Sequence, residues 1–418
     1  MHTKKALNLL NRINRFLPSR ENSAVFLSLA FVIGFLGARA VLSIATLLLG
    51  LNALRGTHPR DWLRNRFWWM AVGWVALYAL SFFWSSNMEE WGERVQVKLP
   101  FLLFPLAVAY PLQLHRNQWQ VLLSGTCVLL LGGVAFSLSY YFPNAAAIAK
   151  GYESSQTFRT PAYNDHICFS AFLAATIFWI LAVWPKLASP VKVLAGISTA
   201  IFGLYLHILA AKTGLVMFYG AGLLLLFREL YLKHYRRFGL FFLTGLLGVV
   251  VAYGTLPTLR GRIGYFRYSF MEYFSGRPSG NYSDPARLYS YDVAVRQIAR
   301  SPLGGYGAGD VVSAMDTGYT ESHPHVAAEN RLVPHNQFLA SGIAVGVPAM
   351  IVLLIWWLGG VVAVRRFPER TRFFNIGIWL LVSVLLFVDP AFEVQFGVAT
   401  FLFFQYWFRN LTHTEPVS

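Results

Sequence analysis

The chain has 418 residues, of which 56% are hydrophobic and only 13% are charged. Soluble domains carry about 25% charged residues, so this chain has too little polar surface to face water on all sides. The composition excludes a soluble enzyme, a disordered chain and a collagen-like repeat, and it predicts an all-α integral membrane protein. The formal net charge of +16 would suggest nucleic acid as a partner only if the protein were soluble.

Twelve apolar segments follow one another along the chain. Most of them are long enough to cross a hydrocarbon core of about 30 Å, which takes roughly 20 residues. We therefore expect about twelve transmembrane helices, and an even number places both termini on the same side. The segments lie near residues 23–37, 39–55, 67–84, 99–112, 119–142, 165–184, 191–210, 213–228, 239–256, 343–364, 373–388 and 392–408.

The basic residues are distributed unevenly between the two sides of this topology. The side that holds both termini carries 21 of the 35 basic residues and five acids, whereas the other side carries 14 of each sign. An excess of Lys and Arg marks the cytoplasmic side, so both termini are predicted to be cytoplasmic. The whole excess charge then faces anionic lipid, and no nucleic-acid partner is needed to explain it.

The outer connections include two long ones, near residues 143–164 and 257–335. The second is far too long to be a turn. It divides the chain into helices 1–9 with short loops over 1–256, an outer loop domain over 257–335, and helices 10–12 with a cytoplasmic tail over 336–418. Because the cytoplasmic connections are short and basic, we expect any chemistry on the outer face.

Local patterns predict some structure near this outer face. In the long loop, Asp284 and Pro285 are typical of a helix start, and apolar residues at helical spacing predict an amphipathic helix over 285–300. The glycine-rich stretch 304–309 favours sharp turns, and 311–334 is expected to be irregular. Segment 99–112 is short and interrupted by prolines, which is tolerated where it faces protein or a polar cavity.

His335 is the leading candidate for chemistry because it stands at the outer end of a membrane helix that starts with Asn336. The positive end of the helix dipole disfavours imidazolium, and a neutral imidazole can accept a proton from a hydroxyl. The alternative is a histidine that caps the helix through water. The sequence position alone does not decide between these two interpretations.

Four basic residues at the outer rim could bind an anion. Arginine binds phosphate in a bidentate manner, and several cations at one rim would suit a diphosphate leaving group. The alternative for each residue is an ordinary contact with lipid phosphates. These candidates are Arg159, Lys212, Arg287 and, less prominently, Lys98. Asp389, in a tight outer turn, is expected to orient a cation or to cap helix 12.

Several sequence motifs are missing. The chain has no Asp-x-Asp pair, no GxxxxGK[ST] and no G-x-S-x-G. We therefore expect no bound metal, no ATP as the energy source and no hydrolase-type nucleophile. His323 and His325 are more simply explained as exposed loop residues than as metal ligands.

Three motifs resemble the O-antigen ligase and polymerase family of bacterial inner-membrane proteins. They are the helix that begins near Arg287, the run Pro302-Leu303-Gly304-Gly305-Tyr306-Gly307, and Pro334-His335-Asn336-Gln337-Phe338-Leu339. The stretch Ala211-Lys212-Thr213-Gly214 fits the family's opening motif with Lys in place of Arg. The resemblance covers about residues 210–345, and it implies a GT-C-like glycosyltransferase.

The resemblance implies that a polysaccharide moves from undecaprenyl pyrophosphate to a sugar hydroxyl of lipid A–core at the periplasmic face, without cofactor, metal or ATP. His335 would be the general base, and Arg287 would hold the pyrophosphate together with Arg159, Lys212 and Lys98. Asn336 and Asp389 would support them. The transfer would invert the anomeric carbon, since a covalent route needs a carboxylate for which only Asp389 or Glu393 is placed.

Two alternatives remain open from the sequence. An O-antigen polymerase or a protein O-oligosaccharyltransferase would share these motifs and the same lipid-linked donor. A lipid or glycan transporter would also have twelve spans. The long outer loop and the lack of charges deep in the helices argue against transport.

Overall fold

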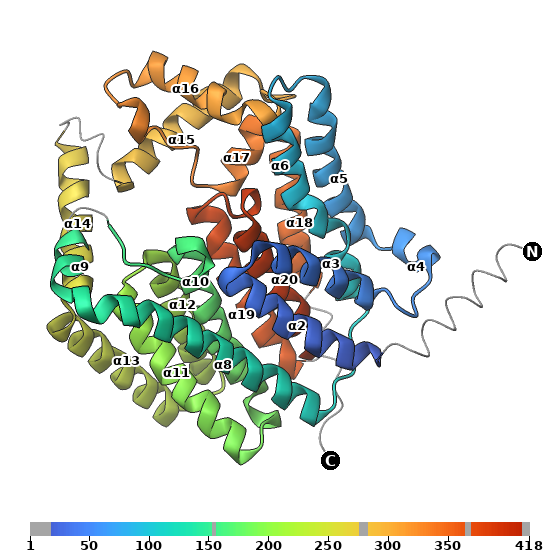
Figure 1. Cartoon of the computed structure of the whole chain (residues 1–418), viewed down its shortest axis with the longest axis vertical. Coiled ribbons are helices and arrows are strands. Elements are labelled where there is room, and N and C mark those ends of the chain that lie inside the picture. The colour runs from blue at the N-terminus through green and yellow to red at the C-terminus, as the bar shows by residue number, and fades with distance from the viewer. Residues whose placement is uncertain (1–17, 153–155, 276–282, 364–368, 412–418) are drawn as a thin grey trace, which may run out of the picture.

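The computed structural model describes residues 18–152, 156–275, 283–363 and 369–411, and the elements in these ranges are helical (Figure 1). This confirms the all-helical prediction. The α-helices are α2 Arg20–Gly37, α3 Arg39–Ala53, α4 Pro59–Leu63, α5 Arg66–Leu80, α6 Met88–Lys98, α7 Phe104–Ala109, α8 Arg116–Tyr141, α9 Ala145–Gly151, α10 His166–Val183, α11 Ser189–Leu209, α12 Lys212–Tyr231, α13 Tyr235–Thr255, α14 Pro257–Phe274, α15 Ser283–Arg300, α16 Val311–Ser322, α17 Gln337–Val345, α18 Val347–Ala363, α19 Glu369–Val388 and α20 Gln395–Asn410.

Eight of the described helices are long and apolar enough to cross a membrane: α2, α5, α8, α10, α11, α12, α13 and α19. Two shorter apolar helices, α3 and α18, accompany them. The proline-broken segment 99–112 forms a 3-10 turn, Leu99–Leu102, followed by the six-residue helix α7. The chain is therefore a multi-pass helical membrane protein, while the count of twelve and the GT-C-like architecture stay predictions.

Contacts between outer connections agree with the alternating topology. The guanidinium of Arg39, the first residue of α3, lies 4.6 Å from the ring centroid of Tyr163, which precedes α10. The Ala308 backbone N–H donates to Ser81 Oγ at 3.1 Å. Each contact joins two segments that the sequence assigns to the same outer side.

Contacts at the opposite end join inner connections to one another. The Leu112 backbone N–H donates to Asn410 Oδ1 at 2.6 Å, and Arg116 Nε donates to the Lys186 carbonyl at 3.1 Å. The basic N-terminal tail over 1–17, which contributes to the predicted inner charge, lies outside the described residues.

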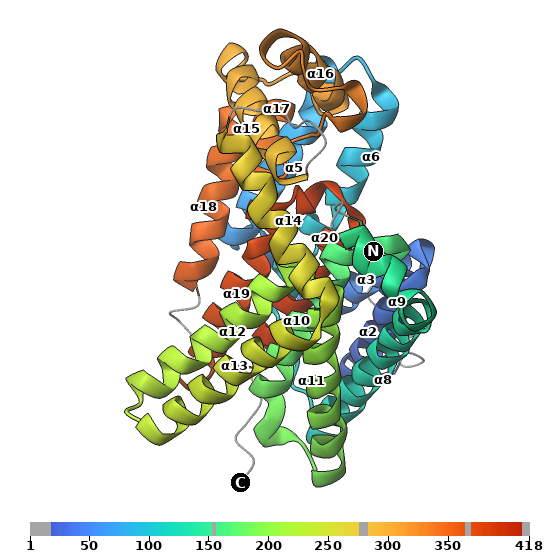
Figure 2. The ribbon, with the colours of Figure 1, turned by 90° about the vertical axis from the view of Figure 1, so that its left-hand side faces the viewer.

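The long outer connection is more helical than its sequence indicated. Helix α15 begins at Ser283, slightly before the predicted start, and α14 precedes it. The prediction of an irregular 311–334 is wrong for its first half, because α16 occupies Val311–Ser322. Figure 2 shows α15, α16 and α17 gathered with α6 at one end of the molecule.

The turn between α19 and α20 is held by an aromatic core. Phe392 is completely buried, and its ring centroid lies 4.6 Å from that of Phe101, 5.0 Å from that of Phe401 and 5.8 Å from that of Trp74. Large aromatic side chains fix a segment strongly because each buries a large area. This anchoring places the neighbouring Asp389 and Glu393 at the outer end of the helices.

Candidate active site

The structure brings together two residues that are distant in the sequence, His335 and Asp389. The Nδ1 atom of His335 lies 2.9 Å from Oδ1 of Asp389, and the two side chains are 21% and 13% exposed. The orientation of the ring does not allow a hydrogen bond between this Nδ1 and the carboxylate. The two groups are therefore in close electrostatic contact without a hydrogen bond. In the described part of the chain, Nε2 of His335 has no hydrogen-bond partner.

Helix α15 packs against the backbone of His335 and contributes a cation. The Tyr291 hydroxyl donates to the His335 carbonyl at 2.8 Å, which fixes the segment that enters α17. Arg287, one turn earlier on α15, is half-buried and lies within electrostatic reach of Tyr291. Its guanidinium makes no hydrogen bond or ion pair with any described side chain, so it can bind an external anion.

The start of α10 completes this group of side chains. Asp165 caps α10, and its Oδ1 accepts from the Cys168 backbone N–H at 2.8 Å. Burial raises the pKa of Asp165, and the nearby Asp389 carboxylate acts in the same direction. The adjacent His166 lies within the electrostatic influence of three charged residues from three other segments: Arg262, Arg287 and Asp389. We call the set Asp165, His166, Arg262, Arg287, Tyr291, His335 and Asp389 the outer cluster.

Asn336 has a local role at the same helix start. Its Oδ1 accepts from the backbone N–H groups of Phe338 at 2.9 Å and Leu339 at 3.2 Å, which makes it the N-cap of α17. The expectation that Asp389 could cap helix 12 is wrong, because the N-cap of α20 is Val394. The Asp389 carboxylate faces His335 instead.

Lys98, the last residue of α6, is completely buried. Its Nζ atom is 2.7 Å from Oε2 of Glu393, and Arg94 Nη1 is 3.1 Å from the same oxygen. Burial lowers the pKa of Lys98 to about 8, and the Glu393 carboxylate opposes that decrease. Burial also penalises the Glu393 carboxylate, but Lys98 and Arg94 outweigh it and hold the pKa of Glu393 at about 2. Both groups are therefore charged at neutral pH.

Arg159 and Lys212 lie on other parts of the outer face. Arg159 is exposed, and its guanidinium carbon lies 5.4 Å from the Phe136 ring centroid. Lys212 begins α12, and its Nζ atom lies 4.9 Å from the ring centroid of Phe266 on α14. Their role in binding pyrophosphate stays a prediction.

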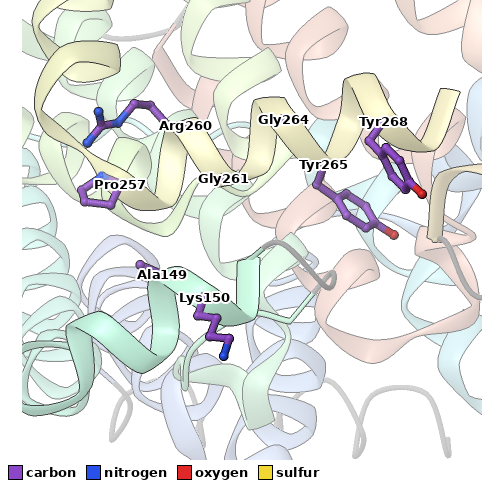
Figure 3. Close-up of a pocket in the computed structure, with 8 residues that line it drawn as sticks. All are labelled: Ala149, Lys150, Pro257, Arg260, Gly261, Gly264, Tyr265 and Tyr268. Atoms are coloured by element: carbon purple, nitrogen blue, oxygen red, sulfur yellow. The ribbon is translucent and has the colours of Figure 1, made fainter. Parts of the chain in front are cut away.

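A groove of about 630 Å³ opens between α9 and α14, away from His335. Its surface combines two cations with two tyrosines and two glycines, and no atom lies within 4 Å of where a Cβ on Gly264 would be. Figure 3 shows the lining residues: Ala149, Lys150, Pro257, Arg260, Gly261, Gly264, Tyr265 and Tyr268. Such a surface suits a group that is anionic at one end and apolar at the other.

Residues 197–354 match the family model described as O-antigen ligase. This region of the chain is similar to the O-antigen ligase family. We call the matched region the family domain; it runs from within α11 to within α18 and contains Lys212, Arg287, His335 and Asn336. No curated protein sequence matches the chain significantly.

Several members of the site lie outside the family domain. His166 begins α10, whereas Asp389 and Glu393 lie in the turn between α19 and α20, and all three reach His335 or its neighbours only in the folded chain. His166 could be noticed from its place at a helix start after Asp165. Nothing in the local sequence pattern indicated that Glu393 would be buried against Lys98.

Proposed function

We propose that the protein is an O-antigen ligase of the Gram-negative inner membrane. It would transfer a polysaccharide from undecaprenyl pyrophosphate to a sugar hydroxyl of lipid A–core at the periplasmic face, with no metal or ATP. The observation that carries this proposal is the His335–Asp389 contact beside Arg287, with His335 and Arg287 inside the family domain.

In the proposed reaction His335 acts as the general base. Its Nε2 accepts the proton of the acceptor hydroxyl while that oxygen attacks the anomeric carbon of the donor sugar. The bond between this carbon and the pyrophosphate oxygen breaks, and the pyrophosphate leaves with the electron pair. Asp389 orients the ring through Nδ1 and stabilises the imidazolium that forms, as the carboxylate does in other His–carboxylate pairs.

Arg287 is proposed to bind the pyrophosphate and stabilise its increasing charge. A fixed guanidinium can make two parallel hydrogen bonds to phosphate oxygens, and it stays charged at every relevant pH. A preorganised cation in a partly dry site stabilises developing charge more than it would in water. Arg159 and Lys212 would add weaker, longer-range attraction, and Lys98 would act only through Glu393.

The surroundings of the two candidate carboxylates favour direct displacement over a covalent glycosyl-enzyme. Asp389 is engaged with His335, and Glu393 is 7% exposed and paired with Lys98 and Arg94. A nucleophilic carboxylate must reach the anomeric carbon. Direct attack by the acceptor hydroxyl would invert that carbon.

Both substrates are lipids and must enter from the bilayer. The groove between α9 and α14 carries Lys150 and Arg260. We propose that it guides the phosphate-bearing end of one lipid substrate toward the site. Segment 99–112, with Phe101 and Phe104 fully packed, offers less room for a lipid head.

The test is deletion of the gene in its host, followed by electrophoresis of the lipopolysaccharide and analysis of the undecaprenyl-linked glycans. Core-only lipopolysaccharide with long chains retained on the lipid carrier supports the ligase. Core bearing a single repeat indicates a polymerase. An unchanged ladder contradicts both and points to protein glycosylation.

A further inference from the structure

A buried charged cluster is connected to the two segments that carry His335 and Asp389. Its centre is Glu393, and its other members are Lys98, Arg94, Tyr78 and Gln337; we call these five residues the Glu393 node. The Oε2 atom of Glu393 accepts from Lys98 Nζ at 2.7 Å and from Arg94 Nη1 at 3.1 Å. Its Oε1 atom accepts from the Tyr78 hydroxyl and from Gln337 Nε2, both at 3.0 Å.

Gln337 connects this node to both residues of the pair. It is the first residue of α17 and follows His335 by two positions, and it is completely buried. Its Oε1 accepts from the Phe392 backbone N–H at 2.7 Å, while its Nε2 donates to Glu393. One amide side chain therefore ties the segment that carries His335 to the turn that carries Asp389.

The node is also tied to a third element, α6. Lys98 and Arg94 lie one turn apart at the end of α6, outside the family domain. A buried carboxylate with two cationic partners contributes little net stability compared with apolar packing, but such groups can fix one arrangement of a structure. Because the Glu393 carboxylate accepts from four donors, the turn that carries it, residues 389–394, has few alternative positions.

We propose that Gln337 and Glu393 are positioning residues that set the separation of His335 from Asp389 and hold the imidazole in its working orientation. This inference rests on the proposed role of the His335–Asp389 pair. Neither side chain reaches substrate, because both are buried. They act through the backbone of the 389–394 turn and through the start of α17.

The test observes the His335 ring itself, so it does not depend on transfer. Protein with ¹⁵N-labelled histidine in nanodiscs is studied by NMR at one fixed pH, and the His335 resonances are those absent from His335→Ala. The ring nitrogen resonances report which nitrogen carries the proton and what that nitrogen contacts. The Asp389 carboxylate is in contact with the ring, and the Tyr291 hydroxyl donates to the His335 carbonyl.

Gln337→Met keeps the side-chain volume and removes both amide contacts. We expect it to shift the His335 ring resonances in the same direction as Asp389→Asn, because both changes loosen the contact between Nδ1 and the carboxylate. In the double variant the resonances should equal those of Asp389→Asn alone, since the glutamine acts through the aspartate. Gln337→Asn replaces Gln337→Met if the latter does not reach the membrane.

Ser341→Ala is the matched control. Its hydroxyl lies 3.3 Å from Gln337 Nε2 and 3.0 Å from the Tyr78 hydroxyl, but it does not contact the turn. We expect the wild-type His335 resonances in this variant. A folded Gln337→Met or Gln337→Asn protein with the wild-type His335 resonances would overturn the positioning role. Full transfer by His335→Ala would instead overturn the proposed role of the His335–Asp389 pair in transfer, whatever the resonances show.

Discussion

The outer cluster and the Glu393 node are two groups of charged residues at the same end of the molecule, and they differ in how their charges are satisfied. In the outer cluster, Arg287 has no ion-pair partner among described side chains, and His335 and Asp389 keep part of their surface exposed. In the node, the Glu393 carboxylate is buried and accepts four hydrogen bonds. The two acids that belong to these groups, Asp389 and Glu393, are four residues apart in one turn.

This difference distinguishes the residues that can bind or react, in the outer cluster, from the residues that support them, in the Glu393 node. Groups that must bind or react need unused donors, acceptors and room, which the outer cluster retains. Buried charges without partners are costly, so a buried group of this kind persists only when it is fully paired. Proximity in sequence to a functional residue is therefore a poor guide to role here, whereas exposure and hydrogen bonding distinguish the two carboxylates.

The largest effect is expected from His335→Ala. Removing a general base typically costs 10²–10⁴-fold in rate, and we expect at least that loss in transfer from lipid-linked donor to lipid A–core. The side chain is 21% exposed at the edge of the fold and does not belong to the apolar core, so gel filtration and thermal unfolding should match wild type. Undiminished transfer by the variant would remove His335 from the mechanism.

Glu393→Leu tests the supporting cluster. It leaves Lys98 and Arg94 buried without a counter-charge, and breaking a buried pair in this way typically costs 3–5 kcal/mol of folding stability. Denaturation in detergent should show this loss. Replacing both cations as well, in Glu393→Leu with Lys98→Met and Arg94→Met, should restore much of it. Wild-type stability of the single variant would show that the node is not buried as described.

Acid should weaken the node before it affects the packing around it. The pKa of Glu393 is lowered from 4.5 to about 2, so its ion pairs contribute stability that is fully present above pH 4.5 and lost as the pH falls toward 2. The expected result is that the difference in unfolding temperature between wild type and Glu393→Gln shrinks over that interval. A difference that stays constant with pH would contradict the low pKa.

The smallest effect is expected in the groove between α9 and α14. Lys150→Ala with Arg260→Ala removes two exposed charges, whose attraction to a lipid phosphate is screened by salt. We expect a few-fold increase in KM for one lipid substrate with unchanged kcat, larger at low ionic strength. Arg236→Ala, at the opposite end of α13, is the control. An equal increase in KM in the Lys150→Ala, Arg260→Ala variant and in the Arg236→Ala control would mean that the groove has no special role.

The sequence predicted the helices and the candidate base from local patterns. Apolar length placed the spans, and the motif around His335 placed this residue at the outer start of α17. Helix α16 was missed, although Val311, Ala314, Met315, Gly318 and Tyr319 recur at helical spacing and are buried. This spacing is itself a sequence signal for a helix.

The side-chain partners could not be predicted in the same way. Asp389 lies 54 positions from His335, and Glu393 lies 295 positions from Lys98. A single sequence does not show such contacts, because they depend on how distant helices pack. For this reason Lys98 was expected to bind pyrophosphate and Glu393 was considered as a nucleophile, whereas the fold buries them against each other.

His335 and Asp389 are proposed to act as one unit in glycosyl transfer. The most direct measurement is the rate of transfer in nanodiscs that contain lipid-linked O-antigen and lipid A–core, for wild type, His335→Ala, Asp389→Asn and the double variant. We expect the double variant to be no slower than His335→Ala alone, because the carboxylate works through the imidazole. A transfer rate in the double variant that is reduced by the product of the two single reductions would contradict a joint role of His335 and Asp389. A wild-type rate in either single variant would contradict it as well.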